Sequence, residues 1–224
     1  MHLKTKLKIM DKRIGIIGSG VVAKALGAGF LKYGYKVMLG TRDAKKLTEW
    51  TKNMGKGVQV GSFAEAAAFG NIVVLATKGT ACESALEMAG AGNLNGKTII
   101  DTTNPIAEVP PENGVIKFFT RQNESLMELF QNTYPEARFV KAFNSIGNAY
   151  MVDPQFESRP TMFICGNHKE AKAEVKEILH QFGWETADFG GVESARAIEP
   201  LCMLWCIPGM LNNEWSHAFR LLKL

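Results

Sequence analysis

The sequence predicts an α/β fold with a doubly wound parallel sheet of the Rossmann type. A small C-terminal part follows, which begins with α/β structure and ends with helices. Strand and helix patterns alternate from residue 13 to residue 143, and such alternation favours parallel strands joined by crossover helices. The run Ile72-Val73-Val74-Leu75-Ala76 has no polar alternation, which is typical of a parallel strand covered on both faces. From Val192 the chain has a helical pattern rich in large apolar side chains.

The first strand and the first helix meet at a glycine-rich turn. The strand Arg13–Ile17 runs into Gly18-Ser19-Gly20, and a helix pattern follows. Gly18 allows the tight turn, Gly20 lets the backbone approach a pyrophosphate, and Ala23 keeps the helix close to the strand. The helix N-terminus points free N–H groups and a positive dipole end at the phosphates. The turn therefore predicts a dinucleotide site; the alternative is a packing turn in another α/β domain.

The end of the second strand, Lys36–Gly40, indicates which dinucleotide binds. An NAD site usually carries Asp or Glu about twenty residues after the turn, where it binds the ribose 2′-hydroxyl. Thr41 and Arg42 occupy that place here, and Lys45-Lys46 follow one turn later. Arginine donates a planar fork to phosphate and lysine adds a point charge, so the arrangement favours the 2′-phosphate of NADP. Asp43 is the nearest acid and leaves NAD as the alternative.

Composition limits the classes of function. The 224 residues are 46% hydrophobic and 21% charged with a formal net charge of +4, and no basic block with interleaved aromatics suggests nucleic acid. No apolar run reaches the ~18–20 residues of a membrane span, and the basic tail 1–12 lacks the apolar stretch of a secretion signal.

The cysteines form no CxxC pair and no histidine stands at metal-ligand spacing, so we expect no metal and a reduced, cytoplasmic location. Cys202 and Cys206 share a predicted helix face, as core residues or as a redox pair.

The remaining patterns give the expected order of elements. Two capping boxes, Ser62–Glu65 and Thr80–Glu83, start helices that run to residues 69 and 89. Asn167 is expected to cap an amphipathic helix over residues 168–182. Other helices are expected at 44–54, 123–133 and 192–224, the last broken by Pro200 and Pro208. Other strands are expected at 58–60, 98–100, 138–143, 161–165 and 184–187, with a long loop at 106–120.

These patterns divide the chain into three parts. A basic tail occupies residues 1–12, and the NADP-binding Rossmann domain is expected over residues 13–150. Residues 151–224 form a small C-terminal domain that would supply the acceptor pocket and a dimer contact. The loop-rich stretch 144–160 sets the boundary between the two domains.

The reactive end of the cofactor is expected past the C-terminal ends of the central strands. Three segments arrive there, each a strand followed by small or polar residues: Ala76-Thr77-Lys78-Gly79, Thr103-Asn104-Pro105 and Ala142-Phe143-Asn144-Ser145. Alternatively, any one of these residues is simply part of the loop that follows a strand and has no role in binding. Hydride transfer needs positioning rather than a protein nucleophile, and none of His2, His168, His180 and His217 has the context of a proton donor. We therefore assign no catalytic residue, and the missing acid favours an acceptor that is itself a redox ring.

Four segments together carry a family resemblance. Ile14–Gly20, Gly40–Arg42, Lys141–Asn144 and Gly191–Glu199 resemble the NADPH-dependent reductases of the deazaflavin coenzyme F420, and the likeness extends over nearly the full chain. Lys141–Asn144 is also similar to the oxidoreductase domain of membrane ferric reductases. The resemblance implies NADP as cofactor, with coenzyme F420 or a flavin as the second substrate.

The resemblance also implies roles for single residues. Ser19, Gly20 and the following pair Val21-Val22 would contact the pyrophosphate, with Val21 in place of the family's usual asparagine. Thr41-Arg42 and Lys46 would hold the 2′-phosphate. Ala195-Arg196 and Glu199 would pack against the first domain and help form the acceptor pocket.

Two other functions stay open at this point. The first is an NADP-dependent reductase of a small carbonyl or imine, although such enzymes carry a larger all-helical second domain. The second is a non-catalytic NADP-binding module. The apolar C-terminal helices look too large for a lone small lobe to hide, which predicts a homodimer. The residues behind that prediction are Leu201, Leu204, Trp205, Ile207, Met210, Leu211, Trp215 and Phe219.

Overall fold

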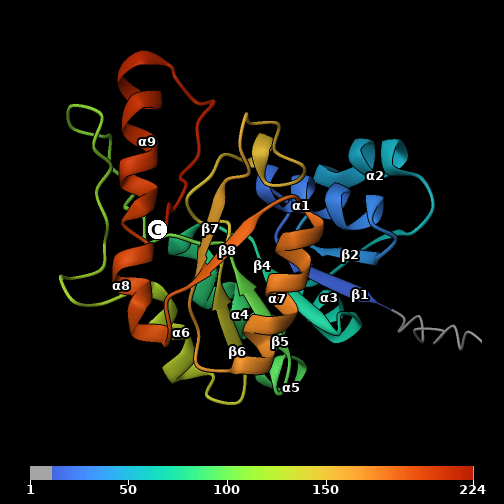
Figure 1. The fold of residues 1–224 in the computed structure, drawn as a ribbon. Coiled ribbons are helices and arrows are strands. Elements are labelled where there is room, and N and C mark those ends of the chain that lie inside the picture. The colour runs from blue at the N-terminus through green and yellow to red at the C-terminus, as the bar shows by residue number, and fades with distance from the viewer. Residues whose placement is uncertain (1–11, 224) are drawn as a thin grey trace, which may run out of the picture.

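The computed structural model describes residues 12–223, and within them it contains a parallel sheet of six strands (Figure 1). The strands are β1 (Arg13–Ile17), β2 (Lys36–Gly40), β3 (Val58–Gly61), β4 (Ile72–Leu75), β5 (Thr98–Asp101) and β6 (Arg138–Lys141). Their order is β3-β2-β1-β4-β5-β6, so the direction of winding reverses between β1 and β4. This reversal defines the doubly wound Rossmann fold, and the expected fold class is confirmed. The expected basic tail lies outside the described residues, apart from Lys12.

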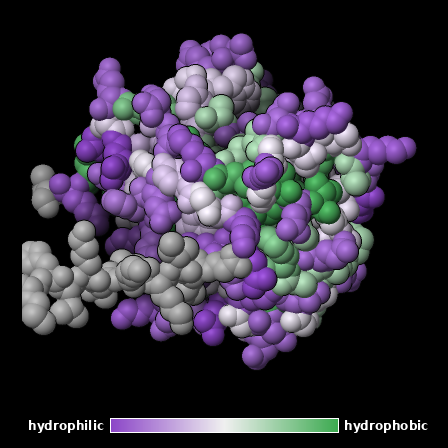
Figure 2. Space-filling model, turned by 90° about the vertical axis from the view of Figure 1, so that its right-hand side faces the viewer, coloured by the Kyte–Doolittle hydropathy of each residue, from purple (hydrophilic) through white to green (hydrophobic). Residues whose placement is uncertain are grey.

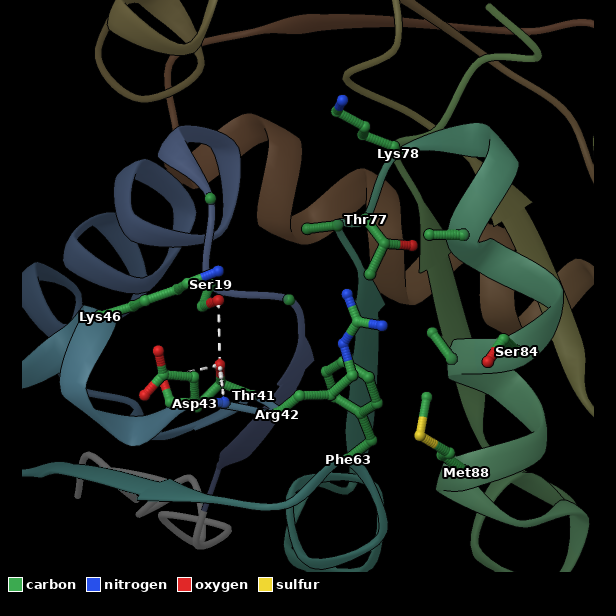
Figure 3. Close-up of a pocket in the computed structure, with 15 residues that line it drawn as sticks. Ser19, Thr41, Arg42, Asp43, Lys46, Phe63, Thr77, Lys78, Ser84 and Met88 are labelled. Carbon is green, nitrogen blue, oxygen red and sulfur yellow. Dashed lines mark hydrogen bonds between the residues drawn. The ribbon is translucent and has the colours of Figure 1, made fainter. Parts of the chain in front are cut away.

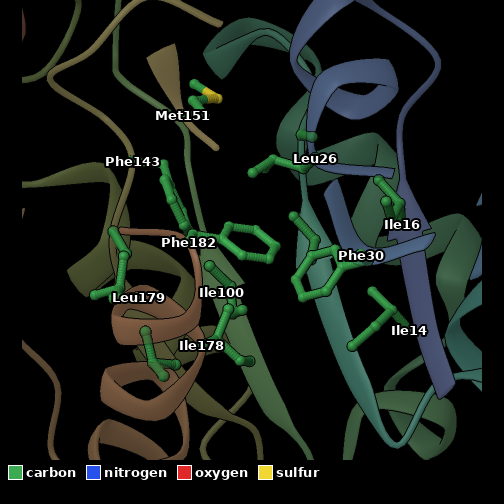
Figure 4. Close-up of a cluster of buried hydrophobic side chains, with 14 of the residues drawn as sticks. Ile14, Ile16, Leu26, Phe30, Ile100, Phe143, Met151, Ile178, Leu179 and Phe182 are labelled. Carbon is green, nitrogen blue, oxygen red and sulfur yellow. The ribbon is translucent and has the colours of Figure 1, made fainter. Parts of the chain in front are cut away.

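Helices cover both faces of the sheet. One face packs against α1 (Val21–Lys32) and α7 (Lys169–Gln181), whose apolar sides meet in a buried cluster (Figure 4). In this cluster the ring of Phe30 lies 5.0 Å from the ring of Phe182, the residue that ends α7. The other face packs against α3 (Phe63–Phe69), α4 (Cys82–Ala89), α5 (Ala91–Leu94) and α6 (Leu126–Thr133). Because both faces are covered, β4 and β5 are buried along their whole length.

The C-terminal part continues from β6. A parallel pair, β7 (Thr161–Ile164) and β8 (Glu185–Asp188), flanks α7, and the backbone N–H of Lys141 donates to the carbonyl of Cys165 at 3.0 Å. The helices α8 (Ala195–Ile198) and α9 (Leu201–Asn212) follow. One buried cluster includes residues of both α1 and α7, so the parts before and after residue 150 share core packing. The division of the chain at residue 150 stays a prediction.

The predicted helix over residues 192–224 is wrong at its end. Asn213 adopts a left-handed conformation (φ 59°) that ends α9, and the chain then returns toward β7 without helical structure. The N–H of Thr161 donates to the carbonyl of Phe219 at 2.9 Å, which ties this return segment to the edge of the β7–β8 pair. Pro208 lies inside α9 and does not break it.

Tertiary partners decided two of the three predicted caps. Ser62 and Glu65 form the expected capping box at the start of α3. Thr80 instead donates to Glu108 at 3.2 Å, and α4 starts after a 3-10 turn at Gly79–Ala81. Asn167 instead accepts the N–H of Val192 at 2.9 Å, so the capping predictions for Thr80 and Asn167 are wrong.

Two further helix predictions need new boundaries. The expected helix at 44–54 is split into a 3-10 turn (Ala44–Leu47) and α2 (Thr48–Met54). The expected helix at 123–133 begins only at Leu126, because Ser125 caps α6 by accepting the N–H of Glu128 at 3.2 Å.

The surface is mixed in character. Figure 2 shows the side of the molecule that lies on the right of Figure 1; hydrophilic residues dominate it and hydrophobic residues gather in one patch. Over residues 12–223, none of the helices is both long enough and apolar enough to cross a membrane.

Candidate functional site

A cavity of about 330 Å³ lies at the C-terminal ends of β1, β2 and β4 (Figure 3), and we call it the glycine-turn cavity. Three strand-end segments line it: Gly18–Gly20, Thr41–Asp43 and Ala76–Lys78. The rest of the lining comes from neighbouring helices and turns, through Lys46, Phe63, Ala81, Ser84, Ala85 and Met88. This position is the topological switch point, where open α/β sheets bind their ligands.

The glycine turn is shaped by close backbone contact and by open space. Gly18 has a φ of 143°, and a Cβ placed there would lie 2.2 Å from the carbonyl oxygen of Ala76, so only glycine lets β1 and β4 end this close together. A Cβ placed on Gly20 would meet no atom within 4 Å. Gly20 is also the residue before α1, so the first N–H groups of that helix border an open space that suits an anion.

The residues after β2 surround the glycine turn with polar groups. The hydroxyl of Thr41 lies 3.1 Å from the hydroxyl of Ser19 and donates to the carbonyl of Asp43. In Figure 3 the Lys46 side chain reaches toward Ser19, and the exposed Arg42 points into the cavity. Asp43 turns its carboxylate to its own backbone and accepts the N–H of Lys45 at 3.0 Å. The described charges that line this cavity, Arg42, Asp43, Lys46 and Lys78, are therefore predominantly positive.

A second cavity of about 790 Å³ adjoins the first, and we call it the loop cavity. The two cavities share Gly20 and the segment Ala76–Lys78. The walls of the loop cavity include apolar side chains from the start of α1 and from the loop after β5: Val21, Val22, Ile106, Ala107, Val109 and Pro110. Its polar lining comes from Thr77, Thr80 and Thr102–Asn104.

One acid and one base face each other at the edge of the loop cavity. The Nζ of Lys78 lies 3.7 Å from Oε1 of Glu108, and both side chains are largely exposed. The hydroxyl of Thr80 donates to the same carboxylate oxygen, so Glu108 joins the long loop to the turn before α4. An exposed pair of this kind contributes little to stability.

The thiol of Cys82 lies beneath the segment that the two cavities share. Its sulfur is 3.1 Å from the hydroxyl of Thr77 and donates to the carbonyl of Lys78 at 3.2 Å. Burial raises the pKa of Cys82 to about 11, so the thiol stays protonated near neutral pH. A buried, protonated thiol supports the floor of the site and is a poor nucleophile. All four cysteines, including Cys202 and Cys206, are free thiols.

The structure brings most of the predicted site residues together. The glycine-turn cavity contains Gly18, Ser19, Gly20, Thr41, Arg42, Lys46, Ala76, Thr77 and Lys78. The loop cavity adds Val21, Val22, Gly79 and Asn104. Lys45, Pro105, Ala142, Phe143 and Asn144 line neither cavity.

Local structure explains why some of the predicted site residues line neither cavity. Lys45 follows Asp43 in a 3-10 turn, and it is Lys46 that lines the cavity. Phe143 has a left-handed φ of 62°, and its ring packs inward at 6.2 Å from Phe182. Asn144 is buried behind the Asn104 corner of the loop cavity, to which it is hydrogen-bonded. Whether any of these residues contacts a cofactor stays a prediction.

Several lining residues were absent from the predicted site. Phe63, Ser84, Ala85 and Met88 lie on helices that reach the glycine-turn cavity only through packing, and no local pattern marks them. Thr102 follows β5 directly, so its position at a strand end was available as a signal, whereas Thr103 was already expected at the crevice and lines the loop cavity.

Comparison with known proteins assigns the family. Residues 13–105 match the model of the family described as NADP oxidoreductase, coenzyme F420-dependent. A solved structure of an Arthrobacter sp. FB24 protein, provisionally named as an F420-dependent NADP-reductase, is 30% identical and superposes with a TM-score of 0.87. The match covers 96% of this chain and 100% of that one. The chain belongs to the family of coenzyme F420-dependent NADP oxidoreductases. The expected family is confirmed, and with it the class of NADP-dependent oxidoreductases.

Two kinds of curated relative differ in length. The F420-dependent NADP reductase of Methanothermobacter thermautotrophicus is 25% identical over 97% of this chain and 98% of its own. Metalloreductase STEAP2 of Homo sapiens is 29% identical over 93% of this chain, but the match covers 40% of that protein. The chain therefore spans about two fifths of the length of the metalloreductases it matches. An imine reductase from Aspergillus terreus, 17% identical with a TM-score of 0.63, shares the fold alone.

In this F420-dependent NADP oxidoreductase family member, two of the C-terminal residues expected to help form the acceptor pocket, Arg196 and Glu199, are paired with residues of α6 and β6. Arg196 makes hydrogen bonds to Glu128 of α6, and the buried Glu199 pairs with Lys141 of β6. Both therefore pack against the sheet domain, and neither lines the loop cavity. Residues 12–223 contain no group of three or more His, Cys, Asp or Glu side chains arranged to hold a metal ion.

Proposed function

We propose that the chain transfers a hydride between NADPH and a ring acceptor, either a deazaflavin such as coenzyme F420 or a flavin. The observation that carries this proposal is the continuity of the two cavities, which share Gly20 and Ala76–Lys78. A dinucleotide that lies along the glycine turn would bring its reactive ring to this junction. The larger, partly apolar loop cavity then offers space for a second flat ring.

The lining of the glycine-turn cavity fits NADP. Open space over Gly20 leaves room for a pyrophosphate at the start of α1. Arg42 and Lys46 supply two positive charges after β2, where a 2′-phosphate would lie. Asp43, the acid that left NAD as an alternative, accepts the N–H of Lys45 within its own turn. These contacts favour NADP over NAD.

The residues of the loop cavity would act by positioning. When bound, NADPH supplies the hydride, and a conjugated acceptor ring takes up the resulting charge without a side-chain acid. Val21, Ile106 and Val109 would exclude water from the rings, while Asn104 offers a polar side chain to orient them. Lys78 and Glu108 are the titratable side chains among the described residues that line this cavity. They lie at its edge and pair with each other.

One absorbance assay tests the proposal. Purified protein, NADPH and oxidised coenzyme F420 are mixed, and the loss of the deazaflavin's visible absorption is followed. We expect rapid loss with NADPH and little with NADH. If NADPH binds but neither the deazaflavin nor a flavin is reduced, the acceptor proposal is wrong. Turnover of a small carbonyl or imine, or tight NADPH binding without any turnover, would then support the alternatives.

The expected homodimer and the cytoplasmic location stay predictions. Leu204, Met210 and Leu211 of α9 are exposed apolar side chains, whereas Trp205 is buried in the core. Light scattering at micromolar protein tests the dimer: a monomeric mass would contradict it.

A further inference from the structure

Three charged side chains are buried together behind the loop cavity, and we call them the buried ion cluster: Asp101 of β5, Lys141 of β6 and Glu199 after α8. The Nζ of Lys141 lies 2.6 Å from Oδ2 of Asp101 and 2.8 Å from Oε1 of Glu199. None of the three side chains is more than 2% exposed. The cluster thus joins two neighbouring strands, β5 and β6, to the C-terminal helices.

The charges of the cluster are balanced by its surroundings. Two carboxylates face one ammonium, and the excess negative charge meets the N-terminus of α6. There the backbone N–H groups of Leu126 and Met127 donate to Glu199 at 3.0 and 3.1 Å. Burial by itself lowers the pKa of Lys141, but the two carboxylates outweigh burial and raise that pKa above its ordinary value. Lys141 is therefore a fixed positive charge.

The cluster holds Thr103, a lining residue of the loop cavity, from three sides. The backbone N–H and the hydroxyl of Thr103 both donate to Oδ1 of Asp101, at 2.9 and 2.7 Å. The Nζ of Lys141 donates to the carbonyl of Thr103 at 2.9 Å. Each polar group of Thr103 therefore has a partner within the cluster.

Asn144 holds the next lining residue, Asn104, in a reciprocal pair. The side-chain amide of Asn144 donates to Oδ1 of Asn104 at 3.1 Å, and the amide of Asn104 donates to the carbonyl of Asn144 at 2.8 Å. Asn144 also donates to the carbonyl of Ile198, one residue before Glu199. On the opposite side, a Cβ placed on Gly79 would lie 2.1 Å from the carbonyl oxygen of Asn104, so the corner has no room to move that way.

Stability alone is a poor reason for such a cluster. Replacing a buried ion pair by well-packed apolar residues is often neutral or stabilising, because desolvation opposes the attraction between the charges. Here the hydrogen bonds converge on two consecutive residues of a cavity wall. Precise placement of a lining segment is a role that apolar packing fills less well, because hydrogen bonds fix direction as well as distance.

We propose that Asp101, Lys141, Glu199 and Asn144 are positioning residues, which hold the Thr103–Asn104 corner so that an acceptor ring is fixed over the nicotinamide. The proposal rests on the hydride transfer proposed above. It gives the C-terminal helices a part in acceptor placement without any contact with the acceptor: α8 delivers Ile198 and Glu199 to the back of the corner.

Two substitutions and one matched control test this role. Asn144→Ala removes the pair with Asn104, and Glu199→Gln removes one charge of the cluster at nearly constant shape. Gln131→Ala is the control, because Gln131 is also buried and donates to the carbonyl of Ala137 at 2.8 Å, at the opposite end of β6. For each variant we would measure the NADPH Kd, the kcat and KM with oxidised coenzyme F420, and the thermal midpoint. Hydrogen exchange of a peptide that spans residues 98–106 reports on the corner itself.

We expect Asn144→Ala and Glu199→Gln to lower kcat by about ten- to hundredfold, the cost of a small misplacement of reacting groups. The NADPH Kd should stay within about twofold, since the glycine-turn cavity is untouched, and the Thr103 amide should exchange faster. Gln131→Ala should lower the thermal midpoint and leave kcat unchanged. Folded variants with wild-type kcat, or with wild-type exchange at residues 98–106, would overturn the positioning role. If wild-type protein reduces no acceptor, the proposed hydride transfer fails, and the exchange measurement still decides whether the four residues hold the corner.

Discussion

The glycine-turn cavity and the Thr103–Asn104 corner are built in opposite ways. The cavity obtains two of its positive charges from Arg42 and Lys46, exposed side chains within a few residues of the end of β2. The corner is held by side chains that are almost fully buried and that arrive from β5, β6 and the end of α8. The first is therefore a local construction on the surface, and the second is a tertiary one.

This difference suggests a division of tasks. Exposed charges recognise a charged group and can be exchanged with little effect on folding, because water solvates them in either state. Buried charges are intolerant of the loss of one partner, because the remaining charge is left without solvent. We therefore expect substitutions in the two regions to separate cofactor affinity from stability and acceptor placement.

The largest expected effect is on stability. Lys141→Met leaves two carboxylates without their buried partner, and we expect the free energy of unfolding to fall by about 3–5 kcal/mol. Lys117→Met is the matched control, because Lys117 forms a surface pair with Glu112 at 3.1 Å. The control should change the free energy by less than about 1 kcal/mol. Urea unfolding measures the free energy of unfolding of both variants. A similar decrease in the two variants would contradict the expected difference between the two regions.

Next in size is the effect of Arg42→Asp on cofactor affinity. Loss of a charge-assisted contact should weaken NADPH by about 1.5–3 kcal/mol and NADH much less. Fluorescence titration of both nucleotides measures the difference. Arg159→Asp makes the same change of charge at an exposed position outside both cavities and should affect neither nucleotide. Equal losses of NADPH and NADH affinity in Arg42→Asp would show that Arg42 does not bind the 2′-phosphate.

A smaller effect distinguishes two neighbouring lysines. Lys46 lines the glycine-turn cavity and Lys45 does not, although the sequence predicts both as ligands. Lys46→Gln should weaken NADPH by about 0.5–1 kcal/mol, as expected of an exposed charge contact, and Lys45→Gln should have no measurable effect. Fluorescence titration with NADPH in low salt checks this. An equal loss of NADPH affinity in both variants would favour a general positive electrostatic field over a specific contact of Lys46.

The smallest effect concerns pH and the tie between α6 and α8. Burial tends to raise the pKa of Glu128, but hydrogen bonds from Arg196 and Ser125 outweigh burial and hold that pKa below its ordinary value. The stabilisation is therefore present above the ordinary glutamate pKa of about 4.3 and is lost as the pH falls through the lower folded value. Unfolding measured between about pH 5 and 3 should show a steeper loss in wild type than in Glu128→Gln. The exposed Glu157→Gln should keep the wild-type slope.

Sequence patterns predicted the elements whose determinants are close together in the chain. The turn after β1, the residues after β2 and the capping box at Ser62 all depend on neighbours within a few positions. The turn and the capping box formed as expected, and Arg42 and Lys46, but not Lys45, line the glycine-turn cavity. The caps at Thr80 and Asn167 failed because distant partners, Glu108 and Val192, form their hydrogen bonds instead. Local competition of this kind is visible only when the fold brings the partners together.

By itself, the sequence determined the parallel sheet, the glycine turn and the charges after β2. The reason is that the period of the hydrophobic pattern, the spacing of the glycines and the residue type are local properties of the chain. Only the tertiary structure decided that Phe143 turns inward, that Asn144 lies behind Asn104, and that the buried charges of β5, β6 and α8 meet. The physical reason is that burial and pairing of polar groups depend on which segments approach one another, and that approach is fixed by packing of the whole core.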